Sequence, residues 1–144
     1  LKDLGEDIFR YFGLGCRNVS KLLVPKDYDF EKLLKSISNF SDVAEHSKYK
    51  NNFDYNLTLL LLNKVAHLKN DFLLLTENTN VVSPVSVLHY EFYENENHLN
   101  EILVRDKEKI QCVVGKQIDF GKTQTPSLTD FADDVDTMTF LSKL

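Results

Sequence analysis

The sequence is poor in cysteine, proline and glycine, with two, three and five of these among its 144 residues. The two cysteines, Cys16 and Cys112, lie far apart without a C-x-x-C or histidine spacing, which excludes a structural zinc motif and a disulfide framework. The longest apolar run, residues 57–62, is too short to span a bilayer, and no charged start with an apolar signal region is present. We therefore expect reduced thiols, no stable membrane insertion and a cytoplasmic location.

The sequence also lacks a basic stripe. Its net charge is −5 and its lysines are scattered, whereas nucleic-acid binding needs a basic patch, so we expect no nucleic-acid partner. The hydrophobic share of 42% and the charged share of 27% are those of an ordinary globular protein, and a chain of this length can bury a core as one domain. Because the first residues already show helical spacing and residue 1 is leucine, we expect residues 1–144 to be a single domain of a longer protein.

Hydrophobic periodicity and turn residues predict an alternation of helices and strands. The predicted helices cover residues 3–12, 29–40, with Asp29 as the N-cap, 54–64 and 97–105. For 54–64 periodicity alone does not decide between a buried helix and a strand, and we favour the helix. The predicted strands cover residues 21–24, 72–76, 85–93 and 110–114. Residues 128–144 are expected to form one or two short helices. Such alternation predicts an α/β fold with a mainly parallel sheet flanked by helices.

Cys16 is the residue with the clearest chemical setting. It follows Gly13-Leu14-Gly15, where glycine lets the backbone approach a ligand closely, and it precedes Arg17, so we expect its thiol to be reachable from solvent at the edge of a concave surface. A neighbouring cation favours the thiolate, which is the nucleophilic form of cysteine. A buried structural cysteine is the alternative, since free thiols are among the most buried side chains. Cys112 lies in the apolar run 110–114, and we expect it to be an inert core thiol.

Three other features carry weaker chemical signals. The four histidines have no metal-ligand spacing, so no metal site is predicted. The acidic cluster near the end is interpreted as a solvated face or helix-start charge; it comprises Asp130, Asp133, Asp134 and Asp136. The loop 120–126 is either a structural turn or a segment that lines a site.

Two stretches resemble motifs of the aldehyde dehydrogenase superfamily. Residues 11–24 are similar in spacing to N-x-G-Q-x-C-x-A-x-x-R-x-x-V, with Cys16 at the nucleophile and Lys21 at the cation. Residues 81–92 are similar to E-x-F-G-P-V followed by V-x-x-F. More specifically, three stretches resemble the LuxC-type acyl-CoA reductases. They are YFGLGCRNVSKLL (11–23), residues 83–93 and FGKTQTPSLTDFADDVDTMTFL (120–141).

This resemblance implies a catalytic domain of the aldehyde dehydrogenase fold, with the nucleotide-binding domain upstream and absent from this chain. It implies acyl-CoA as the substrate, and NADPH or NADH held mainly by the missing domain. Cys16 would be the nucleophile. The residues near the substrate or oxyanion would be Gly15, Arg17 and Asn18. The cofactor vicinity is matched only in part, by Asn80, which stands where many relatives have a ribose-binding glutamate, and by Phe120 and Gly121 in a late loop.

Two departures from the superfamily pattern concern the expected site. Leu14 replaces the motif's glutamine, and Asn80 replaces the glutamate. The general base and the oxyanion asparagine of the superfamily lie upstream of the cysteine, hence before Leu1. Two other functions remain open: a hydrolytic aldehyde dehydrogenase, which needs a base to activate water, and a non-catalytic binding or oligomerisation domain. A homo-oligomer is compatible with each of them.

Overall fold

The structure, a computed structural model, describes residues 1–131 and 135–144. Its centre is a four-stranded sheet in the order β1-β4-β3-β2. The strands are β1 (Lys21–Pro25), β2 (His67–Lys69), β3 (Leu74–Glu77) and β4 (Val87–Tyr93). β4 pairs in parallel with both β1 and β3, and β2 is antiparallel to β3. The predicted α/β class with a mainly parallel sheet is therefore confirmed. β2 was not predicted, because three residues are too few to show an alternating pattern.

The helices agree in part with the predicted ranges. The α-helices are α1 (Leu4–Phe9), α2 (Phe30–Ser36), α3 (Ser47–Leu62), α4 (Glu96–Arg105) and α5 (Thr137–Leu141). The 3-10 helices are η1 (Arg10–Gly13), η2 (Ser38–Glu45) and η3 (Lys107–Lys109). Asp29 caps α2 as predicted, since its carboxylate accepts a hydrogen bond from the Lys32 N–H. Among the described residues, no helix is both long and apolar enough to cross a membrane.

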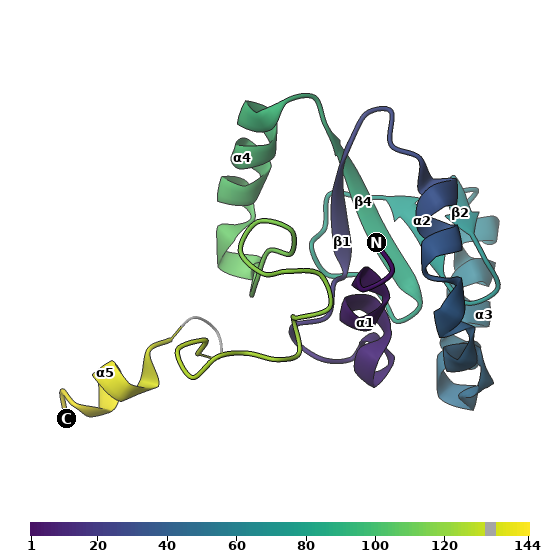
Figure 1. Ribbon diagram of the computed structural model, residues 1–144. Helices are drawn as coiled ribbons and strands as arrows, with labels where there is room; N and C mark the ends of the chain where they lie inside the picture. The colour runs from purple at the N-terminus through teal and green to yellow at the C-terminus, as the bar shows by residue number, and fades with distance from the viewer. Residues whose placement is uncertain (132–134) are drawn as a thin grey trace.

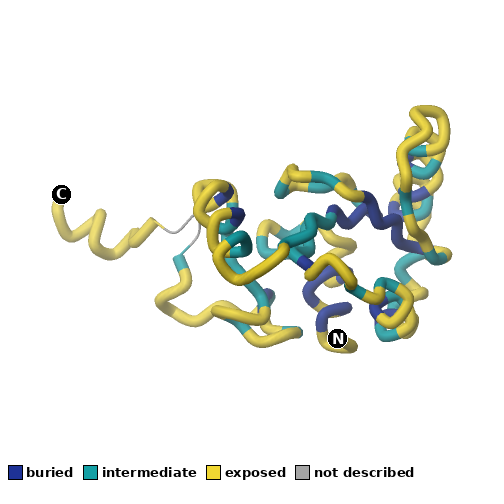
Figure 2. The backbone as a smooth tube through the Cα atoms, turned by 90° about the horizontal axis from the view of Figure 1, so that it is seen from above, coloured by how far each residue is buried: buried dark blue, intermediate teal, exposed yellow. Residues whose placement is uncertain are grey.

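The helices cover both faces of the sheet, because side chains alternate along each strand. Leu75 and Leu88 pack with α1, α2 and η2 in the larger core, whereas Leu74 and Val87 face α3. Figure 1 shows α1 and α2 in front of the strands, with α4 beside β1 and β4. Figure 2 shows the buried positions gathered along the middle of the molecule, while the outer helices and the C-terminal segment are exposed.

The C-terminal third differs most from the prediction. Residues 110–114 form no strand; they run as an irregular segment that makes a single bridge, from Val114 to Ile118. α5 extends away from the body of the molecule, and most of its apolar side chains are exposed (Figure 1). Asp136 caps α5 through the Thr139 N–H, in agreement with the helix-start interpretation. Asp133 and Asp134 lie outside the described residues.

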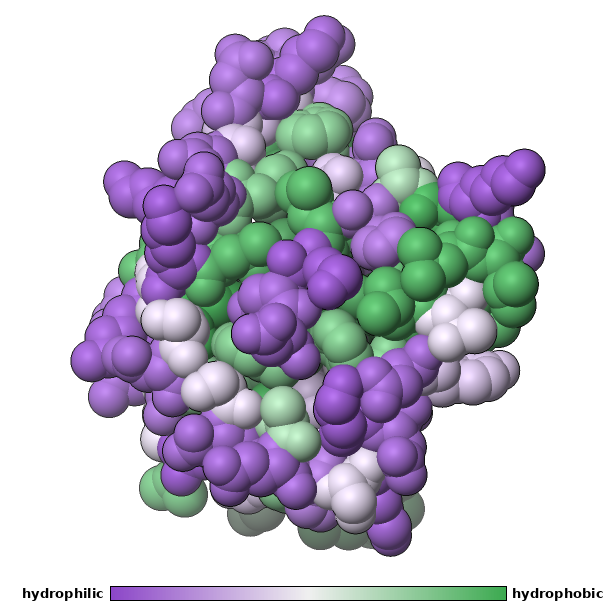
Figure 3. Space-filling view, turned by 90° about the vertical axis from the view of Figure 1, so that its right-hand side faces the viewer, coloured by the Kyte–Doolittle hydropathy of each residue, from purple (hydrophilic) through white to green (hydrophobic). Residues whose placement is uncertain are grey.

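The leucine-rich helix α3 begins earlier than predicted, because His46 caps it through the Tyr49 N–H. Its N-terminal half buries Tyr49 and Phe53, but Leu61 and Leu62 near its end are exposed. Figure 3 shows the side of the molecule that carries α2, α3 and β2, where apolar side chains lie among hydrophilic ones. The run 57–62 is therefore only half covered by the sheet.

Candidate active site

A groove of about 500 Å³ runs along the outer edge of β1 and is open to solvent. Its volume falls in the usual range of small-molecule sites. Its lining comes from the turn around Cys16, from β1, from α4 and from residues 109–116. Cys16, which is exposed as predicted, and Cys112 both line it. The groove is thus the concave surface on which the chain presents its thiols.

The turn that precedes Cys16 has an unusual backbone. α1 ends at Phe9, and three successive residues, Tyr11, Phe12 and Gly13, have φ values of 55°, 60° and 72°. The left-handed conformation is unfavourable for residues with a side chain, so it persists only where surrounding contacts hold it. Phe12 stacks on His46 with ring centroids 4.2 Å apart, which provides one such contact.

Asn18 provides the other contacts that hold this turn. Its side-chain amide donates hydrogen bonds to the carbonyls of Asp7 (2.8 Å), Arg10 (3.0 Å) and Ile8 (3.3 Å) at the end of α1. Its Oδ1 accepts the Gly15 N–H at 2.7 Å. A Cβ on Gly15 would stand 2.7 Å from that oxygen, so this close approach requires glycine. Asn18 therefore positions the turn that carries Cys16, by joining it to α1.

Two backbone donors remain available beside the thiol. The Gly15 N–H is occupied by Asn18. In contrast, the N–H groups of Cys16 and Arg17 have no hydrogen-bond partner among residues 1–131 and 135–144. Unpaired N–H groups next to a nucleophile can stabilise negative charge that develops on a carbonyl oxygen during its attack. Of the three successive N–H groups, those of Cys16 and Arg17 can therefore receive a ligand, whereas that of Gly15 cannot.

Asp7, a buried carboxylate with 1% exposure, joins the loop 120–126 to the helix that precedes this turn. Asp7 accepts hydrogen bonds from the Gly121 N–H (2.6 Å), the Thr123 N–H (3.1 Å) and the Thr123 hydroxyl (2.9 Å). Arg17 Nε donates to the Thr123 carbonyl at 2.7 Å. Asp7 was missed from the sequence because it lies between Leu4 and Ile8 on the apolar side of a short helix. The only signal was a carboxylate at a core position.

Cys112 corrects one prediction. It is only half-buried, and it lies in the irregular segment rather than in a core strand. Burial raises the pKa of its thiol above the ordinary value, and the nearby charge of Arg17 acts in the opposite direction. A raised pKa disfavours the nucleophilic thiolate at neutral pH. Cys16 is therefore the more exposed of the two thiols, and the surroundings of Cys112 disfavour its thiolate form.

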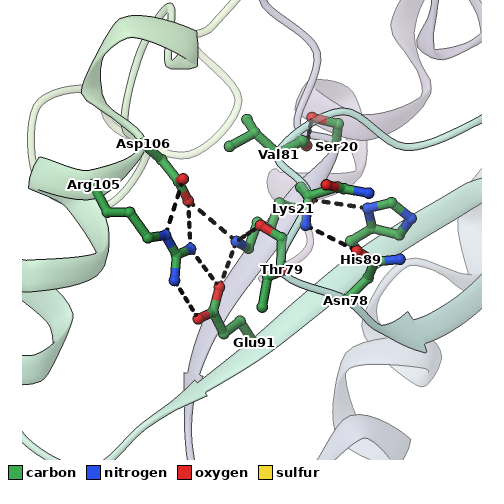
Figure 4. A network of polar contacts seen from close by, with 10 residues as sticks. Ser20, Lys21, Asn78, Thr79, Val81, His89, Glu91, Arg105 and Asp106 are labelled. Atoms are coloured by element: carbon green, nitrogen blue, oxygen red, sulfur yellow. Dashed lines mark hydrogen bonds and ion pairs between the residues drawn. The ribbon is translucent and has the colours of Figure 1, made fainter.

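Lys21, at the start of β1, is the centre of an ion network (Figure 4). Its ammonium lies 2.5 Å from Glu91 on β4 and 3.4 Å from Asp106 after α4. Arg105 contacts the same two carboxylates, at 2.9 Å and 2.6 Å. Hydrogen bonds from Arg105, followed by the charge and bonds of Lys21, hold the pKa values of Glu91 and Asp106 below their ordinary values. The cation matched by the cysteine motif thus fastens α4 to the sheet.

Asn80 does not line the groove. Its side chain is exposed, and its carbonyl lies 3.0 Å from Nδ1 of His89, a buried residue of β4. Burial lowers the pKa of His89, which keeps the ring neutral and lets Nδ1–H donate to that carbonyl. His89 therefore has a structural role.

The parts of the chain that the structure describes contain no group of three or more His, Cys, Asp or Glu side chains placed to hold a metal.

The structure thus brings most of the predicted site residues together. Cys16, Arg17, Asn18 and Phe120 line the groove. Gly15 and Gly121 lie immediately next to it and are held by Asn18 and Asp7.

Comparison of the chain with protein-family models, with curated proteins and with solved structures gives no significant match.

Proposed function

We propose that this chain is the thiol-bearing catalytic part of an acyl-CoA reductase, with Cys16 as the residue that carries the acyl group. The observation that supports this most is the exposed thiol of Cys16 in the lining of a groove of about 500 Å³, next to two unpaired backbone N–H groups. A nucleophile, donors for a developing oxyanion and a binding groove are the parts that acyl transfer requires.

In the proposed reaction the Cys16 thiolate attacks the thioester carbonyl. A bond forms between its sulfur and the carbonyl carbon, and the carbonyl oxygen takes up negative charge within reach of the N–H groups of Cys16 and Arg17. The bond to the coenzyme sulfur then breaks, and the coenzyme leaves as a thiolate that takes a proton from solvent. The product on the protein is an acyl-Cys16 thioester.

A reductase needs a hydride donor for the second half of the reaction. A nicotinamide cofactor would supply that hydride and convert the acyl group to an aldehyde. The described residues do not fit such a cofactor, because no glycine-rich phosphate loop follows a strand and Asn80 lies outside the groove. The chemistry assigned to this chain therefore ends at the acyl-enzyme.

The charges of the groove suit an anionic substrate with an apolar part. Lys21 and Asp106, which both line it, neutralise each other. The other charged residues in its lining are Arg17, Lys109 and Lys116, all cationic. Cations around a mostly apolar groove favour a ligand that joins phosphates to an acyl chain, as acyl-CoA does. This local excess of positive charge contrasts with the net charge of −5 for the whole chain.

The hydrolytic alternative is less well supported. Hydrolysis of an acyl-enzyme needs a base that activates water. Within the described part of the chain, Asp106 is the carboxylate that lines the groove, and it is held in ion pairs with Lys21 and Arg105. Its lowered pKa makes it a weak base. A hydrolase would therefore have to take its base from another part of a longer protein.

Intact-protein mass spectrometry tests the proposal. The protein is incubated with palmitoyl-CoA or hexanoyl-CoA without reduced cofactor, and we expect the mass of one acyl group to be added. The adduct should be absent from Cys16→Ala and retained by Cys112→Ala. Labelling that survives Cys16→Ala would move the nucleophile elsewhere. Labelling by an aldehyde with oxidised cofactor, but not by acyl-CoA, would favour the hydrolytic dehydrogenase, and no labelling by either substrate would favour the non-catalytic domain.

A further inference from the structure

The outer edge of β1 carries backbone groups that the sheet does not use. β1 ends the sheet on one side, with β4 as its neighbour. The His89 N–H donates to the Ser20 carbonyl at 3.0 Å, so alternate residues of β1 face β4 in this parallel ladder, and Leu22 is one of them. The N–H and C=O groups of Lys21 and Leu23 therefore point away from β4, and no hydrogen bond reaches them in the described part of the chain. Such groups are available to another extended chain.

This unpaired stretch is short, because the backbone on both sides of it is occupied. Before it, the Val19 N–H donates to the carbonyl of Asp7 in α1 at 2.9 Å, and after it, the Pro25 carbonyl accepts the Tyr28 N–H at 3.0 Å. Strands of globular proteins usually comprise about five or six residues, whereas the open part of this edge offers the groups of two outward residues. A short chain with amide groups fits this edge better than a strand of a partner protein.

The same edge belongs to the groove that presents the Cys16 thiol. Residues 16–25 line the groove in unbroken succession, and α4 contributes Leu99, Ile102 and Leu103 to the lining. A ligand that fills the groove and brings its reacting group to Cys16 therefore lies beside β1. It contacts apolar side chains of the lining together with the free backbone groups of the strand edge.

The coenzyme part of an acyl-CoA has this combination of groups. Its pantetheine arm is an extended chain that begins at the thioester sulfur, carries two amide groups separated by two methylene groups, and ends in a unit with two geminal methyl groups. Amide N–H and C=O groups pair with a strand edge as peptide groups do. Methylene and methyl groups suit an apolar lining. A free aldehyde has no such amides, so pairing with the strand edge distinguishes a coenzyme thioester from it.

We infer that the free edge of β1 binds the pantetheine arm of the thioester in the manner of an added strand, with the backbone groups of Lys21 and Leu23 paired to its amides and the thioester at Cys16. The inference rests on the proposed function, because it concerns the acyl donor of the same groove. Recognition of the coenzyme then comes from the main chain of β1 as well as from the cationic side chains. Thioesters that lack the amides should acylate Cys16 more slowly, although they carry the same acyl group.

Acyl donors with two, one or no amides test this recognition. They are hexanoyl-pantetheine, hexanoyl-N-acetylcysteamine and S-ethyl thiohexanoate, none of which carries the phosphates. Each rate of Cys16 acylation, measured by intact-protein mass spectrometry, is divided by that donor's rate with free N-acetylcysteine to remove differences between leaving groups. We expect the normalised rate to fall about tenfold from the first donor to the last, as for the loss of one or two hydrogen bonds. Equal normalised rates would overturn the inference, whereas acylation by none of the donors, or by acyl-CoA, would overturn the proposed function.

Leu23→Pro tests the position of the contact. Proline lacks the N–H, and because the Leu23 N–H points away from β4, the ladder of the sheet loses no hydrogen bond. Leu23→Ala is the matched control, since it shortens the same side chain and keeps the N–H. We expect Leu23→Pro to be acylated by hexanoyl-pantetheine about fivefold more slowly than Leu23→Ala, and by S-ethyl thiohexanoate at the same rate. A loss that is equal for the two donors, or no loss, would contradict the contact.

Hydrogen exchange of the wild-type chain needs neither a variant nor a reaction. Desulfo-CoA keeps the pantetheine arm, and at saturation it should slow the exchange of the Lys21 and Leu23 amides by about fivefold or more. Adenosine 3′,5′-bisphosphate, which lacks the arm, should not slow them, and the Leu22 amide, which faces β4, should exchange equally in all samples. Acylation of Cys16 without protection of Leu23 would overturn the inference. Protection by desulfo-CoA without acylation would overturn the proposed function alone.

Discussion

Asp7 Oδ1 accepts both the N–H and the hydroxyl of Thr123, at 3.1 Å and 2.9 Å, although the two residues are 116 positions apart in the sequence. The second carboxylate oxygen of Asp7 accepts the Gly121 N–H. Because Arg17 bonds to the same loop through the Thr123 carbonyl, this carboxylate ties the first helix, the loop after residue 119 and the neighbour of Cys16 into one unit. The geometry beside the thiol therefore depends on a contact that closes most of the chain.

Asp7→Asn should destabilise the protein. The asparagine can keep its oxygen toward Thr123, but its NH₂ group then faces the Gly121 N–H and leaves that donor unpaired. We expect the free energy of unfolding in urea to fall by about 2 kcal/mol, the typical cost of an unsatisfied buried group. Glu6→Gln, an exposed change in the same helix, should alter it by less than about 0.5 kcal/mol. An equal effect of the two changes would contradict the role given to Asp7.

Asn18→Ala should impair both the stability of the turn and the reactivity of Cys16. It removes the hydrogen bonds donated to the carbonyls of Asp7, Ile8 and Arg10 and the one accepted from the Gly15 N–H, and we expect a loss of about 2 kcal/mol in the free energy of unfolding for these partly exposed bonds. The left-handed residues before Cys16 then lose their support. Under conditions where the variant is still folded, we expect iodoacetamide to alkylate Cys16 more slowly than it does in the wild type. The alkylation rate at Cys112 in the same sample serves as the internal reference. Asn51→Ala, at an exposed position of α3, should leave both measurements unchanged.

Lys21→Met should be more harmful than a comparable change at the surface. Only 6% of the Lys21 side chain is exposed, and its removal leaves Glu91 and Asp106 with Arg105 as their remaining cation. We expect the free energy of unfolding to fall by roughly 3 kcal/mol, as is usual when one member of a buried ion pair is removed. Lys35→Met is the matched control, since the Lys35–Glu31 pair is exposed and should contribute less than about 0.5 kcal/mol. Similar losses in the two variants would mean that the network does not hold α4.

The same network predicts how stability depends on pH. Glu91 and Asp106 have pKa values below their ordinary values of 4.5 and 3.8, with hydrogen bonds from Arg105 as the largest cause. A carboxyl whose pKa is lower in the folded state stabilises the protein above its ordinary pKa, and this stabilisation is lost as the pH falls through the folded value. We therefore expect the stability difference between the wild type and Arg105→Met to be constant above about pH 5 and to shrink below about pH 4. Urea titrations from pH 3 to pH 7 would measure it, and a difference that is independent of pH would contradict the assignment.

Several parts of the fold could be predicted because their signals are local. Asp29 followed by apolar residues at helical spacing predicted the start of α2, and alternating or β-branched runs predicted β1, β3 and β4. The exposure of Cys16 followed from a glycine turn next to it in the sequence. The run 110–114 shows the limit of such signals. Its composition is that of a strand, yet a strand also needs a partner edge, and in this structure the segment lines the same groove as β1 without joining the sheet.

The sequence by itself determined the elements with strong periodicity and the α/β class, because capping, alternation and turn residues act within a few positions. Only the tertiary structure decided that Asp7 holds the loop around Thr123. The same is true of the ion pairs that Lys21 forms with Glu91 and Asp106. It also decided that Cys112 lines the same groove as Cys16. These relationships join residues far apart in the chain. They depend on how the helices pack against the sheet, and a buried carboxylate or lysine takes whichever partners that packing brings within hydrogen-bonding distance.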